Sequence, residues 1–312
     1  MKYFILAGIG VLLVATVLLL IRGPQVAQMK ALTVCPSGCE YSSIQEAIDA
    51  AQPENTVEIK AGTYRENIEI KKSLTIRGVS QEKVIIDGDK RGYSVVRIMT
   101  PGEQAILVRL EGLQIIGAEG GNGMLLQGSA QAKIRGCTIS RNTGDGIRLE
   151  DSAQIEISKC TISENDYGIW LWNSARVEIT DCIITLNDTG IVVLGSALGK
   201  ITDSRITRNL LNGVELRGNA QATVNNSIIS ENIINGILLR NSARAIINGN
   251  KIINNWGYGV AFCLEKCGTC LWFWQSFTGQ ASGNDNIIPG PGEPDGNSAG
   301  AVCPGELSFL KE

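Results

Sequence analysis

The feature that most constrains the fold is a repeat of 22 to 24 residues in the middle of the chain. The repeat copies are residues 134–156, 157–178, 179–200, 201–223 and 224–246, with a looser copy at 110–133 and the start of another at 247–262. Within each copy, three short stretches alternate apolar and polar residues, which is typical of β-strands. Three short strands cannot bury an apolar face alone, so successive copies must stack into a solenoid.

Small and polar residues recur where the strands of each copy must turn. One corner begins with Gly, and another carries Ser-Ala or Asn-Ala; we expect such residues to supply left-handed backbone. The Gly positions are Gly123, Gly146, Gly168, Gly190, Gly213, Gly236 and Gly259. An Asn recurs at a single phase, at Asn142, Asn165, Asn187, Asn209, Asn232 and Asn255. Stacked Asn side chains can hydrogen-bond from coil to coil, so these residues are predicted to be structural.

This arrangement resembles the right-handed parallel β-helix superfamily, the pectin lyase-like fold, over roughly residues 30–305. Residues 33–78 resemble the opening of pectin-methylesterase-like β-helix proteins. The resemblance implies an all-β, single-stranded right-handed parallel β-helix. Near its start, Ser43 and Glu46 form a capping-box pattern before an amphipathic segment with Ile44, Ala47 and Ile48 on one face, which predicts an N-terminal helical cap.

The N-terminus predicts export. Residues 3–21 form an uncharged run of nineteen residues, closed by Arg22, Gly23 and Pro24, and this run is long enough to cross a bilayer as a helix. An uncleaved membrane anchor is favoured over a cleaved signal peptide, and a buried core helix is the third alternative. The predicted divisions are an anchor or signal segment at 1–28, an N-terminal cap with the first coils at 29–109, repeats at 110–262, and a Cys-containing C-terminal cap at 263–312.

Charge and composition exclude several function classes. The chain has 28 basic and 31 acidic residues, a net charge of −3, so a nucleic-acid partner is not expected. It contains no His, which excludes Ser-His-Asp catalysis and His-ligated zinc.

The nine cysteines form three sets. Cys35 and Cys39 are close enough in sequence for a local disulfide. Three more share one phase of the repeat and are predicted to be a buried stack, namely Cys137, Cys160 and Cys182, followed in the same column by Ser204, Ser227 and Asn250. The last set is Cys263, Cys267, Cys270 and Cys303, for which export favours disulfides over a metal site or free thiols.

The resemblance places a ligand groove on the outward face of the strand that follows the Gly corner. Trp170 and Trp172 face outward there, flanked by Arg148 and Glu150, and an exposed aromatic face is suited to stacking on a sugar ring. The predicted ligand-binding set is Trp170, Trp172, Arg148, Glu150, Glu215, Arg217 and Arg240. Packing under another segment and contact with a protein are the alternatives for the two Trp side chains.

Evidence for catalysis is weaker. Glu150 and Glu215 lie three coils apart, about 14 Å, which exceeds the spacing of glycosidase carboxylates. Asp166 and Asp188 are in phase on neighbouring coils, where they suit a carboxylate pair, a weak calcium site or simple turn residues. The weak catalytic candidates are therefore Glu150, Asp166, Asp188 and Arg148. Apart from this calcium no cofactor is expected, and the active-site signatures of pectin methylesterases and mannuronan epimerases are absent.

These observations favour an exported protein, membrane-tethered through residues 3–21, that binds envelope or environmental polysaccharide without catalysis. One alternative is a lyase or hydrolase acting on acidic glycans. The other is an envelope scaffold or adhesion module that binds protein. The fold itself does not decide among them, because it hosts many unrelated functions.

Overall fold

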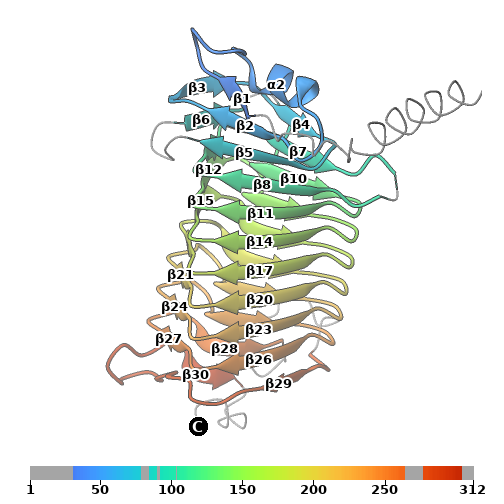
Figure 1. Ribbon diagram of the computed structural model, residues 1–312. Coiled ribbons are helices and arrows are strands. Elements are labelled where there is room, and N and C mark those ends of the chain that lie inside the picture. The colour runs from blue at the N-terminus through green and yellow to red at the C-terminus, as the bar shows by residue number, and fades with distance from the viewer. Residues whose placement is uncertain (1–30, 79–83, 90–91, 103, 264–276, 304–312) are drawn as a thin grey trace, which may run out of the picture. The chain divides into compact units, whose positions relative to one another are not determined.

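The computed structural model describes residues 31–78, 84–89, 92–102, 104–263 and 277–303, which all belong to one compact unit, Ala31–Glu312. This unit is a right-handed parallel β-helix of about 10 turns. Each turn of the repeat region contributes one strand to each of three parallel sheets, so the chain climbs the solenoid as a spiral (Figure 1). The prediction of three strands per repeat and of a stacked solenoid is confirmed.

The described residues form three sheets, which we call A, B and C. Sheet A consists of β1 (Ala31–Val34), β2 (Thr56–Ile59), β5 (Leu74–Gly78), β8 (Leu107–Glu111), β11 (Gln131–Arg135), β14 (Gln154–Ser158), β17 (Arg176–Thr180), β20 (Leu198–Thr202), β23 (Gln221–Asn225), β26 (Arg244–Asn248) and β29 (Gln280–Ser282). Sheet B consists of β3 (Gly62–Arg65), β6 (Val84–Asp87), β9 (Gln114–Ile116), β12 (Thr138–Asn142), β15 (Thr161–Asn165), β18 (Ile183–Thr185), β21 (Arg205–Thr207), β24 (Ile228–Ser230) and β27 (Lys251–Ile253). Sheet C consists of β4 (Ile68–Ile70), β7 (Val96–Met99), β10 (Met124–Gln127), β13 (Ile147–Leu149), β16 (Tyr167–Leu171), β19 (Thr189–Val193), β22 (Val214–Leu216), β25 (Ile237–Leu239), β28 (Tyr258–Phe262) and β30 (Gly300–Cys303).

The Gly column has a different physical cause from the one expected. These glycines do not adopt positive φ; instead, a Cβ on Gly146 would lie 2.6 Å from the carbonyl oxygen of Gly168 and 2.8 Å from Nδ2 of Asn165. Glycine is required because adjacent coils approach too closely for any side chain. The left-handed residues lie elsewhere, three in each copy between residues 134 and 246 and mostly non-glycine, as in Lys159, Glu164 and Asn173 with φ of 54°, 57° and 61°.

The predicted Asn ladder is confirmed. Asn187 donates Nδ2 to Oδ1 of Asn209 at 3.2 Å, and the backbone N–H of Asn165 donates to Oδ1 of Asn187 at 3.1 Å. Both side chains are buried. The same contact repeats from Asn142 up to Asn255, which donates to Asn297 at 2.8 Å. The ladder therefore satisfies backbone donors that the bend leaves without a sheet partner.

The cysteine stack is also confirmed. Cys137, Cys160 and Cys182 are free and buried, and the backbone N–H of Cys137 donates to Sγ of Cys160 at 3.4 Å. Ser204 and its successors continue the column in the same way. The neighbouring thiol of Cys137, together with burial, raises the pKa of Cys160 to about 12, so this thiol stays protonated.

At the N-terminal end, helix α2 (Ile44–Ala50) begins at Ser43, whose side chain accepts from the backbone N–H of Glu46. Its apolar face is buried and contacts β1, β2 and β4. Cys35 and Cys39 form the expected disulfide. Cys263 and Cys303 are both disulfide-bonded, whereas Cys267 and Cys270 lie outside the described residues.

The predicted membrane segment at residues 3–21 also lies outside the described residues. From Ala31 to Cys303, as far as the structure describes the chain, no helix is both long and apolar enough to span a bilayer.

Candidate functional site

The outward face of sheet C carries the predicted site, and its strand register is as expected. Arg148 of β13 pairs with Trp170 of β16, which pairs with Val192 of β19, which in turn pairs with Glu215 of β22. The neighbouring inward residues are buried in the core, because successive side chains of a strand point to opposite faces.

The two Trp side chains form one aromatic platform. The rings of Trp170 and Trp172 lie parallel, with an interplanar angle of 2° and centroids 5.6 Å apart. The guanidinium of Arg148 lies 3.8 Å from the centroid of the Trp170 ring. Trp172 is 45% exposed, so it presents free aromatic surface. These side chains border an open hollow of about 460 Å³, lined by Arg148, Glu150, Asp151, Trp170, Trp172 and Asn173.

Arg148 organises the charges beside this platform. Its Nε donates to Glu150 at 2.7 Å and its NH1 group donates to Asp145 at 3.2 Å, while Gln127 donates to the other oxygen of Glu150 at 2.8 Å. Burial would raise the pKa of Glu150, but hydrogen bonds from Arg148 and Gln127 outweigh it and lower that pKa. Burial raises the pKa of Asp145 to about 6 despite its contact with Arg148.

The remaining predicted ligand residues form a separate cluster. Glu215 is buried; its Oε1 accepts a hydrogen bond from Nε of Arg217 at 2.7 Å and forms an ion pair with Nε of Arg240 at 2.7 Å. Asn212 donates to its other oxygen at 3.2 Å. Since Val192 is buried between Trp170 and Glu215 in the register, the seven predicted residues form two clusters and do not make a continuous row.

Asp166 and Asp188 lie on adjacent coils as predicted. Both are exposed, and the backbone N–H of Asp188 donates to the carbonyl oxygen of Asp166 at 2.8 Å. Burial and the charge of Asp188 raise the pKa of Asp166. Asp145, which the sequence interpretation left outside the catalytic candidates, is the acid nearest the Trp platform with a strongly raised pKa. Its burial, which the sequence pattern does not reveal, is what distinguishes it.

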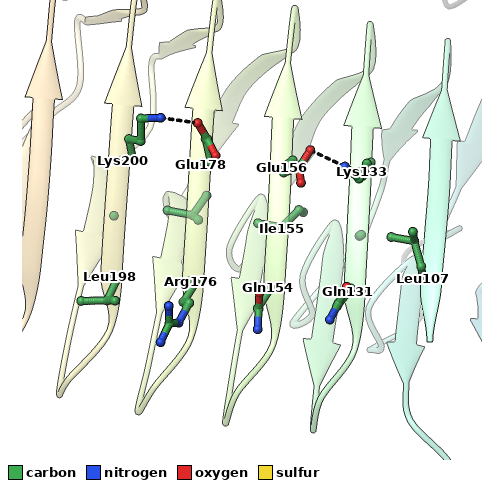
Figure 2. A pocket seen from close by; sticks show the side chains of 13 residues that line it. Leu107, Gln131, Lys133, Gln154, Ile155, Glu156, Arg176, Glu178, Leu198 and Lys200 are labelled. Atoms are coloured by element: carbon green, nitrogen blue, oxygen red, sulfur yellow. Dashed lines mark hydrogen bonds and ion pairs between the residues drawn. The ribbon is translucent and has the colours of Figure 1, made fainter. Parts of the chain in front are cut away.

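A second surface, on sheet A, has no counterpart in the sequence interpretation. Figure 2 shows its outward side chains in regular rows, with Lys133 paired to Glu156 at 2.7 Å and Lys200 paired to Glu178 at 2.6 Å. The four charged groups are about half exposed. The signal for this surface is a column of charged residues at one register position, Lys133, Glu156, Glu178 and Lys200, which is visible once the repeats are aligned. Paired exposed charges of this kind contribute little to binding or stability.

Two family models match the sequence. The right-handed beta helix region model matches residues 122–269, and the model of the periplasmic copper-binding protein NosD matches residues 55–176. None of the curated proteins matches the chain.

Solved structures share the fold at low identity. An alginate lyase from Paenibacillus superposes with a TM-score of 0.66 and 16% identity, covering 87% of this chain and 99% of that one. The A-module of the mannuronan C-5 epimerase of Azotobacter vinelandii gives a TM-score of 0.58 and 17% identity, covering 79% and 83%. Carrot pectin methylesterase gives 0.52 and 13%, covering 90% and 89%. Identities this low establish the fold alone.

The copper-binding description of the NosD model does not fit the metal donors in the part of the chain that the structure describes. The sequence contains no His. The thiols of Cys137 and Cys160 point to the backbone carbonyls of Leu110 and Ile134, buried in the stack. Copper prefers imidazole and accessible thiolate or thioether ligands, and between Ala31 and Cys303 the described side chains include no cluster of three or more His, Cys, Asp or Glu that suits a metal.

Proposed function

On the basis of its pectin lyase-like right-handed parallel β-helix fold, we propose that this protein is exported and binds polysaccharide at the Trp170–Trp172 platform without cleaving it. Residues 3–21 tether it to the membrane. The observation that carries the proposal is the exposed ring of Trp172, held parallel to Trp170 beside charged hydrogen-bonding groups.

The geometry of the platform suits a sugar ring. One face of a pyranose is largely C–H and packs against an aromatic ring, while its hydroxyl groups need donors and acceptors at the edge. Glu150 has a lowered pKa and is ionised at neutral pH, so it can accept hydroxyl hydrogen bonds. Because Arg148 and Gln127 already hold Glu150 in place, less side-chain entropy is lost when a ligand binds.

Export is supported by the cysteine chemistry. The Cys35–Cys39 disulfide and the bonded Cys263 and Cys303 suit an oxidising compartment. The NosD model describes a periplasmic protein, and the alginate lyase and mannuronan epimerase that share the fold are named for action on polysaccharides. We also assign α2 the role of an N-terminal cap, since its buried face packs against the first strands of sheets A and C.

The test is a binding screen with the full chain in lipid nanodiscs, against neutral and uronic-acid polysaccharides, with and without calcium. We expect Trp172→Ala to weaken affinity by about tenfold, the loss of one aromatic stacking contact. The matched control is Trp256→Ala, because Trp256 is 70% exposed at a different corner of the solenoid. Equal affinity of wild type and Trp172→Ala would refute the site.

An enzyme acting on acidic glycans is the second candidate. The observation that favours it is Asp145, whose pKa of about 6 leaves a carboxylic acid available as a proton donor beside Arg148 near neutral pH. The same screen distinguishes the two candidates: product release that disappears in Asp145→Asn supports the enzyme, and binding without products supports the binding protein.

A further inference from the structure

A row of exposed apolar side chains follows the corner between sheets B and C. They come from the one or two positions after Asn209, Asn232 and Asn255 of the ladder, and their exposure ranges from 39% for Ile234 to 70% for Trp256. We call this row the apolar ridge; it consists of Leu210, Leu211, Ile233, Ile234 and Trp256.

Backbone hydrogen bonds hold the ridge in register from coil to coil. Leu210 donates to the carbonyl of Asn187, Ile233 to that of Asn209, and Trp256 to that of Asn232, at 2.9 to 3.0 Å. These three side chains therefore stand in a single column on successive coils. Leu211 and Ile234 form a second column, because the N–H of Ile234 donates to the carbonyl of Leu211 at 2.8 Å.

The same column is acidic on the preceding coils. Asp166 and Asp188 occupy the positions that Leu210, Ile233 and Trp256 occupy later, and both Asp side chains are exposed. The bend therefore accepts polar residues, and the apolar ones are not required by packing. Contiguous exposed apolar residues of this kind mark a binding surface.

We propose that the apolar ridge is a second contact with the bilayer that residues 3–21 are predicted to enter. This inference rests on that predicted segment and not on glycan binding. The apolar run ends at Ile21, nine residues before β1 begins at Ala31, and nine extended residues reach about 30 Å at most. The tether limits the distance of the first coil from the lipid surface. The ridge begins seven coils later, roughly 34 Å along the solenoid, so the proposal places the solenoid lengthwise along the bilayer.

The composition of the ridge fits the lipid interface. Leu and Ile insert into the boundary between headgroups and acyl chains, and Trp is enriched at that depth. The rim is polar and paired: Arg208 and Glu231, the residues before the ladder Asn on two ridge coils, form an exposed ion pair at 2.7 Å. Both charges are long side chains that can stay at the headgroup level while the apolar residues insert.

The test measures fluorescence of the full chain in phosphatidylcholine vesicles whose acyl chains are brominated or unbrominated. The contribution of Trp256 is the difference between wild type and Trp256→Phe, a conservative change at an exposed residue. We expect brominated lipid to remove about half or more of that emission, because bromine quenches only Trp within the bilayer. The double variant Leu210→Ser with Ile233→Ser should lose most of this quenching, whereas Ile246→Ser, 47% exposed on sheet A, should retain it.

Three outcomes would overturn the proposal. Trp256 emission that brominated lipid leaves unchanged excludes insertion, and so does a wild-type chain that fails to sediment with the vesicles. Crosslinking that yields a dimer in wild type, but not in the Leu210→Ser, Ile233→Ser variant, assigns the ridge to a second copy of the chain. Glycan affinity plays no part in these readouts, so they stand or fall separately from the proposed function.

Discussion

Residue types repeat from coil to coil in the interior of the solenoid, whereas they vary on the outer face of the same coils. At the inward position of sheet B, Ile139, Ile162 and Ile184 repeat one residue type on successive coils. On the outward face of sheet C, paired positions run from Arg148 to Trp170 to Val192 to Glu215. Every coil must stack on the next, so the interior tolerates little change, whereas an outward position is under no such constraint. We therefore expect binding or catalytic residues at the outer-face positions that depart from the repeat.

The strongest test of this contrast is a side chain in the Gly column. Gly146→Val should lower the free energy of unfolding by about 3 kcal/mol or more, because its Cβ would meet the carbonyl oxygen of Gly168 at 2.6 Å and the two coils would have to separate. Chemical denaturation measures the change. Gly199→Ala is the control, since its Cβ would have no neighbour closer than 3.5 Å and should cost little. Comparable losses in both variants would contradict the close-approach explanation.

The Asn ladder should be the next most sensitive feature. Asn187→Ala removes the acceptor used by the backbone N–H and by Nδ2 of Asn165 in a buried site. We expect a loss of about 2 kcal/mol, the cost of leaving buried polar groups unpaired. Asn219→Ala, at an exposed corner position, should change the same denaturation midpoint very little. A ladder variant as stable as wild type would mean that water replaces the amide.

A buried charge on the outer face should make stability depend on pH. The pKa of Asp145 is raised from 3.8 to about 6 by burial, so the folded protein binds this proton more tightly than the unfolded chain. Its contribution is therefore full below about pH 4 and is lost as the pH rises to about 6, a decrease of about 3 kcal/mol. Asp145→Asn should abolish this slope in thermal unfolding, and Asn suits the position because Asn212 and Asn235 occupy it on later coils.

The matched control for the pH series is Asp203→Asn, which neutralises an exposed carboxylate in the turn between β20 and β21. It should retain the wild-type slope between pH 4 and pH 6. A slope that persists in Asp145→Asn would assign the titration to another acid, with Asp166 next in order since its pKa is also raised.

The smallest expected effect on stability is at the Trp platform. Trp172→Ala should change the free energy of unfolding by less than about 0.5 kcal/mol, because the side chain is exposed and fills no core space. Thermal unfolding followed by circular dichroism measures it. A loss of more than about 2 kcal/mol would show that Trp172 serves packing, the alternative role considered for it.

The sequence pattern alone predicts much of the site. Period-two alternation and the repeat length placed Arg148 and Trp170 in paired outward positions, and the register bears this out. The sequence pattern does not predict that Arg148 pairs with both Asp145 and Glu150, because this pairing depends on side-chain directions at a corner. The burial of Glu215 beneath Arg217 and Arg240 was missed for the same reason.

The sequence by itself determined the solenoid: its three strands per coil, its Asn ladder and its cysteine column. These features follow from local periodicity. Because stacking requires the same pattern on every coil, that periodicity can be recognised in the sequence. Only the tertiary structure decided why glycine is needed at its corner and which acids become buried. The tertiary structure also showed that the acidic residues Asp166 and Asp188 and the apolar residues of the ridge occupy one column on successive coils. Those outcomes depend on distances between coils about 23 residues apart, set by the roughly 4.8 Å spacing of parallel strands, and no local pattern encodes them.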